Sequence, residues 1–396
     1  MSTTHLQPLL DYQFCANDAY RLISFERLAP ELQAQWRELA ANETFYGVLW
    51  AKDERNSNVK AVDEETALLF LTLKQPGAIP YYLQRKLGQE CTQAVAELVL
   101  DGVLAVSGEN GRFISGAAAH SILYQPNSTP QQQPSHPLLI LSYDALQYGQ
   151  KLLEQDATRL AYSLYSYNIL PLTPAWRKRL ADRSDVYAWL RLVDPTSASS
   201  RALRRAWAAQ QPKADSSWIS WQRKTSKGAQ TAPYKLYVSP RPEILPDILP
   251  KIVEALSQSP AAAFKLGADA AGLLRPDKFV VYLPNFEALS ETAALLENAL
   301  KDTPVHGVPF TAPIDSAGLL SWGMDPPPGT LPFARHELIS WRSWLCDQLA
   351  QHLLRAEETA DVEPWRYALD RLALEGIDIE TWVPNQSMWQ PKQLAR

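Results

Sequence analysis

Basic residues stand at the start of, or just before, each of three predicted strands between residues 234 and 283. The strands are expected at 234–239, 261–266 and 279–283, and the basic residues are Lys235, Lys265, Arg275 and Lys278. Cationic side chains gathered at one end of a small sheet can hold a phosphate group, because their N–H donors and charge match its oxygens. Each cation alone fits an exposed charge at a strand end, so the predicted phosphate site depends on the whole set.

Lys265 is the member of this set whose surroundings point most directly to chemistry. It follows Phe264 in an otherwise apolar segment, where a charged side chain is costly unless the charge is used. Burial lowers the pKa of a lysine, so Lys265 is the natural candidate for a base. On the preceding strand, side-chain alternation places Lys235 on the same face as Tyr237 and opposite Leu236.

The elements that must position these residues predict an α+β domain, with helices packed on one face of a small sheet. The order is strand, helix, strand, strand, helix, and apolar periodicity predicts the helices at 246–256 and 289–300. The Pro- and Gly-rich stretch 303–334 is expected to be ordered loop. Beyond it we predict a long helix from Arg335 to Arg355, a helix at 364–375 and a last strand at 377–382.

The N-terminal part predicts a domain of a different kind. Residues 6–50 indicate helices with breaks. Residues 61–115 predict three helices followed by a two-stranded wing, the pattern of a winged helix-turn-helix. The third of these helices, 91–101, carries Glu97 and Asp101 and no basic residue, which disfavours DNA binding. A peptide-binding role is the better interpretation, and a purely structural role remains equally open.

The composition of the chain indicates how it divides into domains. Residues 125–137 have linker composition, which separates an N-terminal domain at 1–124 from the rest of the chain. The rest consists of a helical, aromatic-rich segment at 138–232 and the α+β domain at 233–396. Within the helical segment, residues 211–232 are polar and are expected to form a loop.

The net charge of −5 argues against general nucleic-acid binding. The three cysteines are widely spaced and odd in number, which predicts neither a disulfide framework nor a zinc site and fits the cytoplasm. The sequence shows no signal-peptide pattern, no apolar run of the roughly 20 residues that a membrane helix needs, no metal-ligand spacing and no nucleotide-binding loop.

An ordered series of short segments from residue 233 to the C-terminus resembles one known family. The segments are Lys235–Val238 with Pro242–Glu243, Phe264–Lys265, Arg275–Tyr282, Pro309–Thr311, Gly318, the region of Pro326, Phe333–Arg335 and Gly376–Glu380. They are similar to the HopA-type effectors of plant pathogens. The C-terminal domain of that family is related to the lyase part of class III and class V lanthipeptide synthesis and, more distantly, to phosphothreonine lyases.

The resemblance implies elimination of phosphate from phosphoserine or phosphothreonine in a peptide, without metal or cofactor. It implies that Lys265 is the base and that Tyr237 protonates the leaving phosphate. The implied phosphate-binding residues are Lys235, Arg275, Lys278 and Arg335. Two departures bear on activity: phosphothreonine lyases carry Lys-x-His where this chain has Lys235-x-Tyr237, and Lys278 replaces the serine expected after Arg-x-Asp.

Three functions therefore remain as alternatives. The first is a lyase of ribosomal peptide (lanthipeptide-type) biosynthesis, which acts on a precursor peptide phosphorylated by a separate kinase and whose winged-helix-like part, residues 61–115, binds the leader. The second is a catalytically silent partner protein that binds a leader or a phosphopeptide. The third is a secreted effector of the HopA type.

Overall fold

The computed structural model describes most of the chain. The described residues are 6, 9–37, 39–52, 59–88, 91–108, 110–124, 134–152, 154–211, 216–225, 232–325, 340–357, 359 and 362–384. The chain divides into two compact units, each with its own core. Unit 1 comprises Met1–Ser2, Gln131–Gln351 and Glu375–Arg396, and unit 2 comprises Thr3–Pro130 and His352–Leu374.

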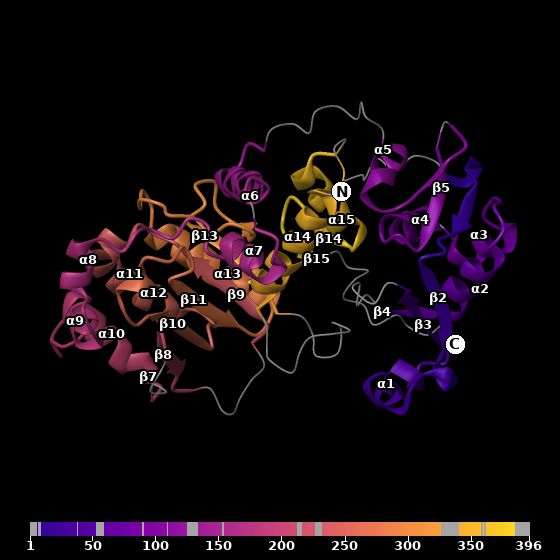
Figure 1. Ribbon diagram of the computed structural model, residues 1–396. Coiled ribbons are helices and arrows are strands. Elements are labelled where there is room, and N and C mark those ends of the chain that lie inside the picture. Colours follow the sequence, from indigo (N-terminus) through magenta and orange to yellow (C-terminus); the bar gives the residue numbers. More distant parts are fainter. Residues whose placement is uncertain are drawn as a thin grey trace. The chain divides into compact units, whose positions relative to one another are not determined.

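A seven-stranded sheet forms the centre of unit 1 (Figure 1), and every neighbouring pair of its strands is antiparallel. The strand order is β12-β13-β9-β11-β10-β8-β7. The strands are β7 (Trp207–Ala209), β8 (Trp218–Arg223), β9 (Tyr234–Val238), β10 (Ala263–Gly267), β11 (Phe279–Leu283), β12 (Ala312–Pro313) and β13 (Leu320–Met324). The predicted α+β class, with an antiparallel sheet and helices, is confirmed, and the sheet is larger than the three strands predicted.

One face of this sheet builds the main core of unit 1. Leu236, Phe264 and Val281 point to this face and pack with the apolar sides of α10 (Ala198–Ala206), α11 (Leu245–Gln258) and α13 (Phe286–Ala299). Phe264 stacks on Phe279 with ring centroids 5.3 Å apart. Because side chains alternate along a strand, the residues between these apolar positions must point to the opposite face. That opposite face carries the lysines predicted to do chemistry.

Two stretches predicted as loop contribute strands to the sheet. β8 lies within 211–232, and β12 and β13 lie within 303–334. Both predictions were wrong for these residues because the strands are short and flanked by polar or Pro- and Gly-rich sequence. Their pairing with β10 and β9 supplies the backbone hydrogen bonds that the local sequence does not indicate.

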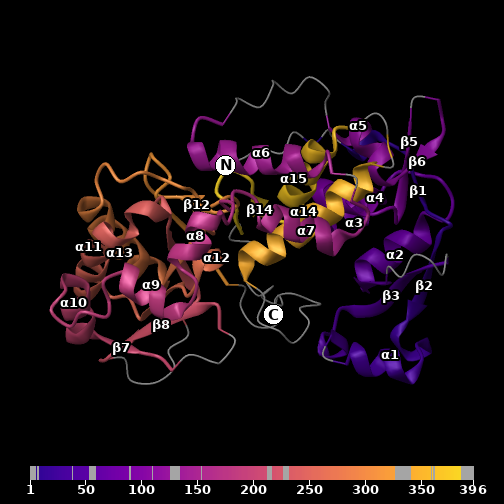
Figure 2. The same cartoon turned by 60° about the vertical axis from the view of Figure 1, so that its left-hand side comes forward.

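The helical character predicted for 138–193 is confirmed. The remaining elements of unit 1 are α6 (Pro137–Gly149), α7 (Ala157–Tyr165), α8 (Pro174–Arg179), α9 (Arg183–Trp189), α12 (Ala270–Leu273), most of α14 (Trp341–Glu357), β14 (Ile377–Asp378) and β15 (Val383–Pro384). Asp156, Thr173, Asp182 and Ser197 cap the first turns of α7, α8, α9 and α10 with their side chains. Figures 1 and 2 both show α10 beside β7, at the sheet edge.

Unit 2 contains two small antiparallel sheets and short helices. Its elements are β1 (Phe14–Ala16), β2 (Tyr20–Ser24), α1 (Pro30–Gln35), β3 (Phe45–Ala51), β4 (Val59–Asp63), α2 (Glu64–Thr72), α3 (Tyr81–Leu87), α4 (Cys91–Leu100), β5 (Leu104–Ser107), β6 (Phe113–Ile114), α5 (His120–Leu123) and α15 (Pro364–Leu374). The sheets have the orders β1-β5-β6 and β2-β3-β4. The helices and strands predicted for 61–115 are present, and their identification as a winged helix stays a prediction.

The prediction of helices for residues 6–50 was wrong for most of that stretch. Leu28, Leu32, Trp36 and Leu39 have helical spacing, but the α-helix there is limited to Pro30–Gln35. These side chains pack instead against strand β3 around Val48. Local apolar spacing therefore described a packing face correctly while overestimating the length of the helix. Of the helices in the described part of the chain, none is both long enough and apolar enough to span a bilayer.

Candidate functional site

The face of the seven-stranded sheet opposite the core gathers three of the predicted site residues. The strand register aligns Lys265 with Val280, Val280 with Tyr237, and Tyr237 with Ser321. The next row aligns Tyr282 with Lys235. We call this surface the polar sheet face and define it by Lys235, Tyr237, Lys265, Tyr282 and Ser321. The predicted common face of Lys235 and Tyr237 and the opposite orientation of Phe264 and Lys265 follow directly from this register.

Lys265 on β10 is half-buried among aromatic rings. Its Nζ lies 4.2 Å from the centroid of the Trp218 ring and 5.6 Å from that of Tyr282. Among the residues that the structure describes, none accepts a hydrogen bond from this ammonium or forms an ion pair with it. Burial, together with the nearby charge of Lys235, lowers the pKa of Lys265 to about 8. A substantial fraction of this amine is therefore neutral near physiological pH.

Lys235 on β9 has a charge partner of its own. Its Nζ donates a short hydrogen bond to Oδ1 of Asp325, which directly follows β13, and the two side chains form an ion pair. The side chain of Lys235 is 12% exposed and that of Asp325 is 36% exposed. An anion that binds Lys235 from solvent must therefore compete with, or join, this carboxylate.

Arg275 belongs to a buried ionic cluster beside the polar sheet face. It donates from Nε and Nη2 to the two carboxylate oxygens of Asp277, at 2.8 Å each, and from Nη2 to the Tyr165 hydroxyl at 3.1 Å. Arg342 of α14 donates from Nη1 to the same carboxylate at 3.3 Å and from Nη2 to the Tyr165 carbonyl. We call Tyr165, Arg275, Asp277 and Arg342 the Asp277 cluster. The two guanidinium groups hold the pKa of Asp277 well below its usual range, despite burial.

Lys278 is placed differently from the other predicted phosphate ligands. Its side chain is fully buried and donates to the carbonyl of Pro240 at 3.0 Å and to Nδ1 of His306 at 2.8 Å. Nε2 of His306 lies 2.7 Å from the carbonyl of Asn168, so this nitrogen carries the proton and Nδ1 is free to accept. Burial lowers the pKa of Lys278 to about 7 and that of His306 to about 3. In this arrangement Lys278 joins β11 to two loops and presents no donor to solvent.

Tyr237 and Ser321 are paired in the strand register and both bring a hydroxyl group to the polar sheet face. Tyr237 is 5% exposed, and burial raises the pKa of its phenol well above the usual value. No described residue shares a hydrogen bond with this phenol. The Ser321 hydroxyl is buried and likewise lacks a partner among the described residues. Because buried hydroxyls are normally hydrogen-bonded, these two groups are available to a ligand or to water.

The sequence identified neither Tyr282 and Ser321 of the polar sheet face nor four residues around it. Asp277 lies within a segment noted for its cations, and its role becomes visible only through the arginines that it holds. Arg342 is on α14 and Tyr165 ends α7, both far from β11 in sequence. Asp325 follows a strand that the sequence did not indicate. The predicted ligand Arg335 lies outside the described residues.

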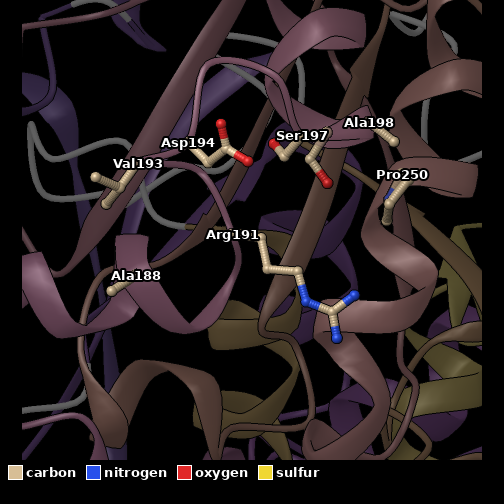
Figure 3. A pocket seen from close by; sticks show the side chains of 8 residues that line it. Ala188, Arg191, Val193, Asp194, Ser197, Ala198 and Pro250 are labelled. Atoms are coloured by element: carbon tan, nitrogen blue, oxygen red, sulfur yellow. The ribbon is translucent and has the colours of Figure 1, made fainter.

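A hollow lies elsewhere in unit 1. It has a volume of about 590 Å³ and is lined by side chains of α9, α10, α11 and the connection between α9 and α10, among them Arg191, Asp194 and Ser197 (Figure 3). Arg191 is paired with Asp247 at 2.8 Å. None of the residues that line this hollow belongs to the polar sheet face, so we do not assign the hollow to the elimination chemistry. Within the described residues, no group of three or more His, Cys, Asp or Glu side chains could hold a metal ion.

Comparison with known proteins gives only distant similarity. No family model matches the sequence, and no curated protein matches it. An effector protein from Pseudomonas syringae pv. tomato strain DC3000 is 9% identical, with a TM-score of 0.41 over 64% of this chain and 99% of that one.

Two lyase structures overlap less well. The type III effector and phosphothreonine lyase OspF from Shigella flexneri is 12% identical, with a TM-score of 0.27 over 35% of this chain and 88% of that one. The phosphothreonine lyase SpvC from Salmonella is 12% identical, with a TM-score of 0.27 over 46% and 90%. The structural neighbours are thus effectors and phosphothreonine lyases, at overlaps too low to carry an argument about fold or activity.

Proposed function

We propose that the polar sheet face eliminates phosphate from phosphoserine or phosphothreonine in a peptide. The observation that carries the proposal is the environment of Lys265: a half-buried amine with a pKa of about 8 that has no acceptor among the described residues. A general base must be neutral near the working pH and unoccupied in the resting protein. Lys265 meets both requirements, whereas Lys278 is fully buried and has two hydrogen-bond partners.

In the proposed reaction, neutral Lys265 removes the proton from Cα of the phosphorylated residue. The electron pair of the Cα–H bond becomes the Cα–Cβ double bond, and the Cβ–O bond breaks with its electrons passing to the phosphate. Tyr237 lies one register row from Lys235 and two strands from Lys265, and supplies the proton to the departing oxygen. The products are a dehydroamino acid in the peptide, inorganic phosphate, a protonated lysine and the phenolate of Tyr237. The phenolate takes a proton back, and Lys265 loses one, before the next turnover.

Two cations are suited to stabilise the phosphate. Lys235 exchanges Asp325 for the more highly charged phosphate, and Arg275 stays oriented by Asp277 while one edge of its side chain, 28% exposed, faces outward. Charge-assisted hydrogen bonds of this kind are the strongest available for an anion, and they strengthen as charge develops on the leaving oxygen.

The substrate class that we propose is a precursor peptide of ribosomal peptide biosynthesis, phosphorylated by a separate kinase in the cytoplasm. It follows from the sequence resemblance to the lyase part of lanthipeptide synthesis. The helices and wing-like strands of residues 61–115 are the proposed site for the leader. A secreted effector acting on a host phosphopeptide is the alternative user of the same chemistry.

A second candidate function has one observation in its favour. Lys235 and Arg275, the cations proposed to bind the phosphate, already have carboxylate partners. The phenol of Tyr237, whose pKa is raised, is also a weaker proton donor than the histidine of phosphothreonine lyases. A protein that binds a phosphopeptide without altering it would show the same features. This candidate predicts binding without loss of phosphate.

One experiment separates the two. The full-length protein is incubated with a phosphothreonine peptide and with the same peptide carrying unmodified threonine, and both binding and mass are followed. The lyase predicts that the phosphopeptide loses the mass of one phosphoric acid and that free phosphate appears. A silent partner predicts tighter binding of the phosphopeptide with its mass unchanged. Equal or absent binding of the two peptides, without loss of mass, contradicts both candidates.

A further inference from the structure

A second hollow in unit 1 lies next to the Asp277 cluster in the sequence. Its volume is about 330 Å³, and its apolar lining consists of Tyr148, Tyr162, Tyr167 and Ile169, together with small polar side chains. Tyr148 comes from the last turn of α6, Tyr162 from α7, and the other two residues directly follow α7. We call it the tyrosine hollow. Its volume is at the lower end of the range of about 300–1,000 Å³ for ligand sites, enough for one or two side chains.

The tyrosine hollow is exposed, and its lining combines aromatic rings and Ile169 with hydroxyl and amide groups. Tyr162 is 70% exposed, Tyr148 46% and Ile169 40%. The rings of Tyr148 and Tyr167 contact each other with centroids 5.6 Å apart, which fixes one wall. Among the described residues of the lining there is no lysine, arginine, aspartate or glutamate. Tyrosine with small polar residues is the composition of surfaces that bind peptides, because a tyrosine ring gives a large contact area at little cost in conformational entropy.

The segment that lines the tyrosine hollow also contains a residue bonded to the proposed phosphate site. Tyr165, between Tyr162 and Tyr167, shares its hydroxyl with Arg275 and Asp277 at 3.1 and 3.2 Å. Asn168, which lines the hollow, donates from its side chain to the carbonyls of His306 and Gly307 at 3.0 and 3.1 Å. The segment 165–168 therefore has the hollow on one side and residues of the catalytic surroundings on the other.

We propose that the tyrosine hollow binds uncharged, apolar residues of the substrate peptide next to its phosphorylated residue. This proposal rests on the proposed phosphopeptide function and names a specificity site for it. A phosphate alone offers no information about the peptide that carries it, so a lyase that selects its substrate needs a second contact. The absence of charge in the lining excludes acidic or basic flanking residues, and its aromatic walls favour proline, leucine or aromatic ones.

The test uses a peptide library with a fixed phosphothreonine and several randomised positions on either side, bound to immobilised full-length protein. We expect apolar residues to be enriched at one or two positions. Tyr148→Ser and Tyr162→Ser should abolish this enrichment and weaken binding of the selected peptide by about five- to thirtyfold. Both side chains are largely exposed, so neither change should unfold the protein, and a thermal melt checks this. Tyr81→Ser is the matched control, because Tyr81 is 72% exposed on α3.

The outcomes separate this inference from the proposed function. A selection that depends on phosphothreonine but shows no apolar preference, or keeps its preference in both tyrosine variants, overturns the inference and leaves the phosphate site standing. Equal retention of the phosphothreonine and threonine libraries overturns the proposed function, and this inference with it.

Discussion

Two half-buried lysines on strands, Lys60 in β4 of unit 2 and Lys265 in β10 of unit 1, use their charge in different ways. Lys60 forms an ion pair with Asp101, whose carboxylate also contacts Arg371 at 2.8 Å and Arg355 at 3.7 Å. Lys265 contacts the faces of aromatic rings. Burial lowers the pKa of both. The carboxylate of Asp101, which opposes this shift, is bonded directly to the amine of Lys60, whereas Asp277 and Asp325 oppose the shift of Lys265 without pairing with its amine.

The same contrast holds for the groups around each lysine. We call Lys60, Asp101, Arg355 and Arg371 the Asp101 cluster. All three of its cations pair with the one carboxylate. The Asp277 cluster satisfies its own two arginines in the same manner, but Lys265 stands beside it without a partner among the described residues. Cations converging on a buried carboxylate are thus a structural feature of both units. The polar sheet face differs because the amine of Lys265 pairs with no carboxylate among the described residues.

The largest effect that we predict is on stability and tests the structural half of the comparison. Asp277→Asn removes the charge that holds two arginines, one of them Arg342, whose side chain is only 2% exposed. Breaking a buried pair leaves an uncompensated charge, so the free energy of unfolding should fall by about 3–5 kcal/mol. Asp101→Asn should cost less, about 1–3 kcal/mol, because the Asp101 side chain is 21% exposed. Urea denaturation of both variants measures the difference, and equal losses would contradict the ranking.

The second prediction concerns pH. As a base, Lys265 is active only when neutral, and its pKa is lowered from 10.5 to about 8. The elimination rate constant should therefore rise by about tenfold per pH unit below pH 8 and level off above it. A pH–rate profile between pH 6 and 10 with a phosphothreonine peptide measures this. A rate that falls as the pH increases from 6 to 8 would exclude a neutral lysine as the base.

The third prediction exchanges the two lysines for an apolar residue of similar length. The folded protein resists protonation of Lys265, so this lysine destabilises the fold fully below about pH 8, and the cost disappears as the pH rises to 10.5. After allowance for its partial exposure, Lys265→Met should stabilise the protein by about 1–2 kcal/mol at pH 7. Lys60→Met should stabilise the protein less than Lys265→Met does, because Asp101 loses a partner in that variant and this loss offsets the gain from removing a buried charge. A lower free energy of unfolding for Lys265→Met at pH 7 would show that Lys265 stabilises the fold, and would contradict the prediction.

The smallest effect on stability is expected for Tyr237→Phe. The Tyr237 hydroxyl has no hydrogen bond to a described residue, so its removal should change the free energy of unfolding by less than about 1 kcal/mol. If Tyr237 protonates the leaving phosphate, the elimination rate should fall by about 10²–10⁴-fold in the same variant. Thermal melts and rate measurements on one preparation test both parts. An unchanged rate would remove Tyr237 from the mechanism and leave solvent as the proton donor.

The sequence predicted the orientation of the site residues better than the extent of the sheet. Strand alternation alone placed Lys235 with Tyr237, because Leu236 between them faces the core. Strand β13 was not predicted, since Leu320–Met324 is short and lies within Pro- and Gly-rich sequence. With it the neighbouring Asp325 was missed, and so was the ion pair of Lys235.

Other parts of the site depend on contacts that no local pattern reveals. Arg342 is one of several polar residues on α14, and its burial against Asp277 and Pro309 results from tertiary packing. Lys278 was predicted to bind phosphate because it precedes a strand, like Arg275. The ammonium of Lys278 instead donates a hydrogen bond to His306, which lies in a loop 28 residues further along the chain.

The central claim is that Lys265 is the base, and a single-turnover comparison tests it most directly. Wild-type protein and Lys265→Arg are mixed in excess with a phosphothreonine peptide, and loss of phosphoric acid is followed by mass spectrometry. Lys251→Arg, an exposed change on α11, is the control. Arginine keeps the positive charge but stays protonated, so we predict a rate reduced by about 10²–10⁴-fold with peptide affinity nearly unchanged. Elimination by Lys265→Arg at the wild-type rate would contradict the claim.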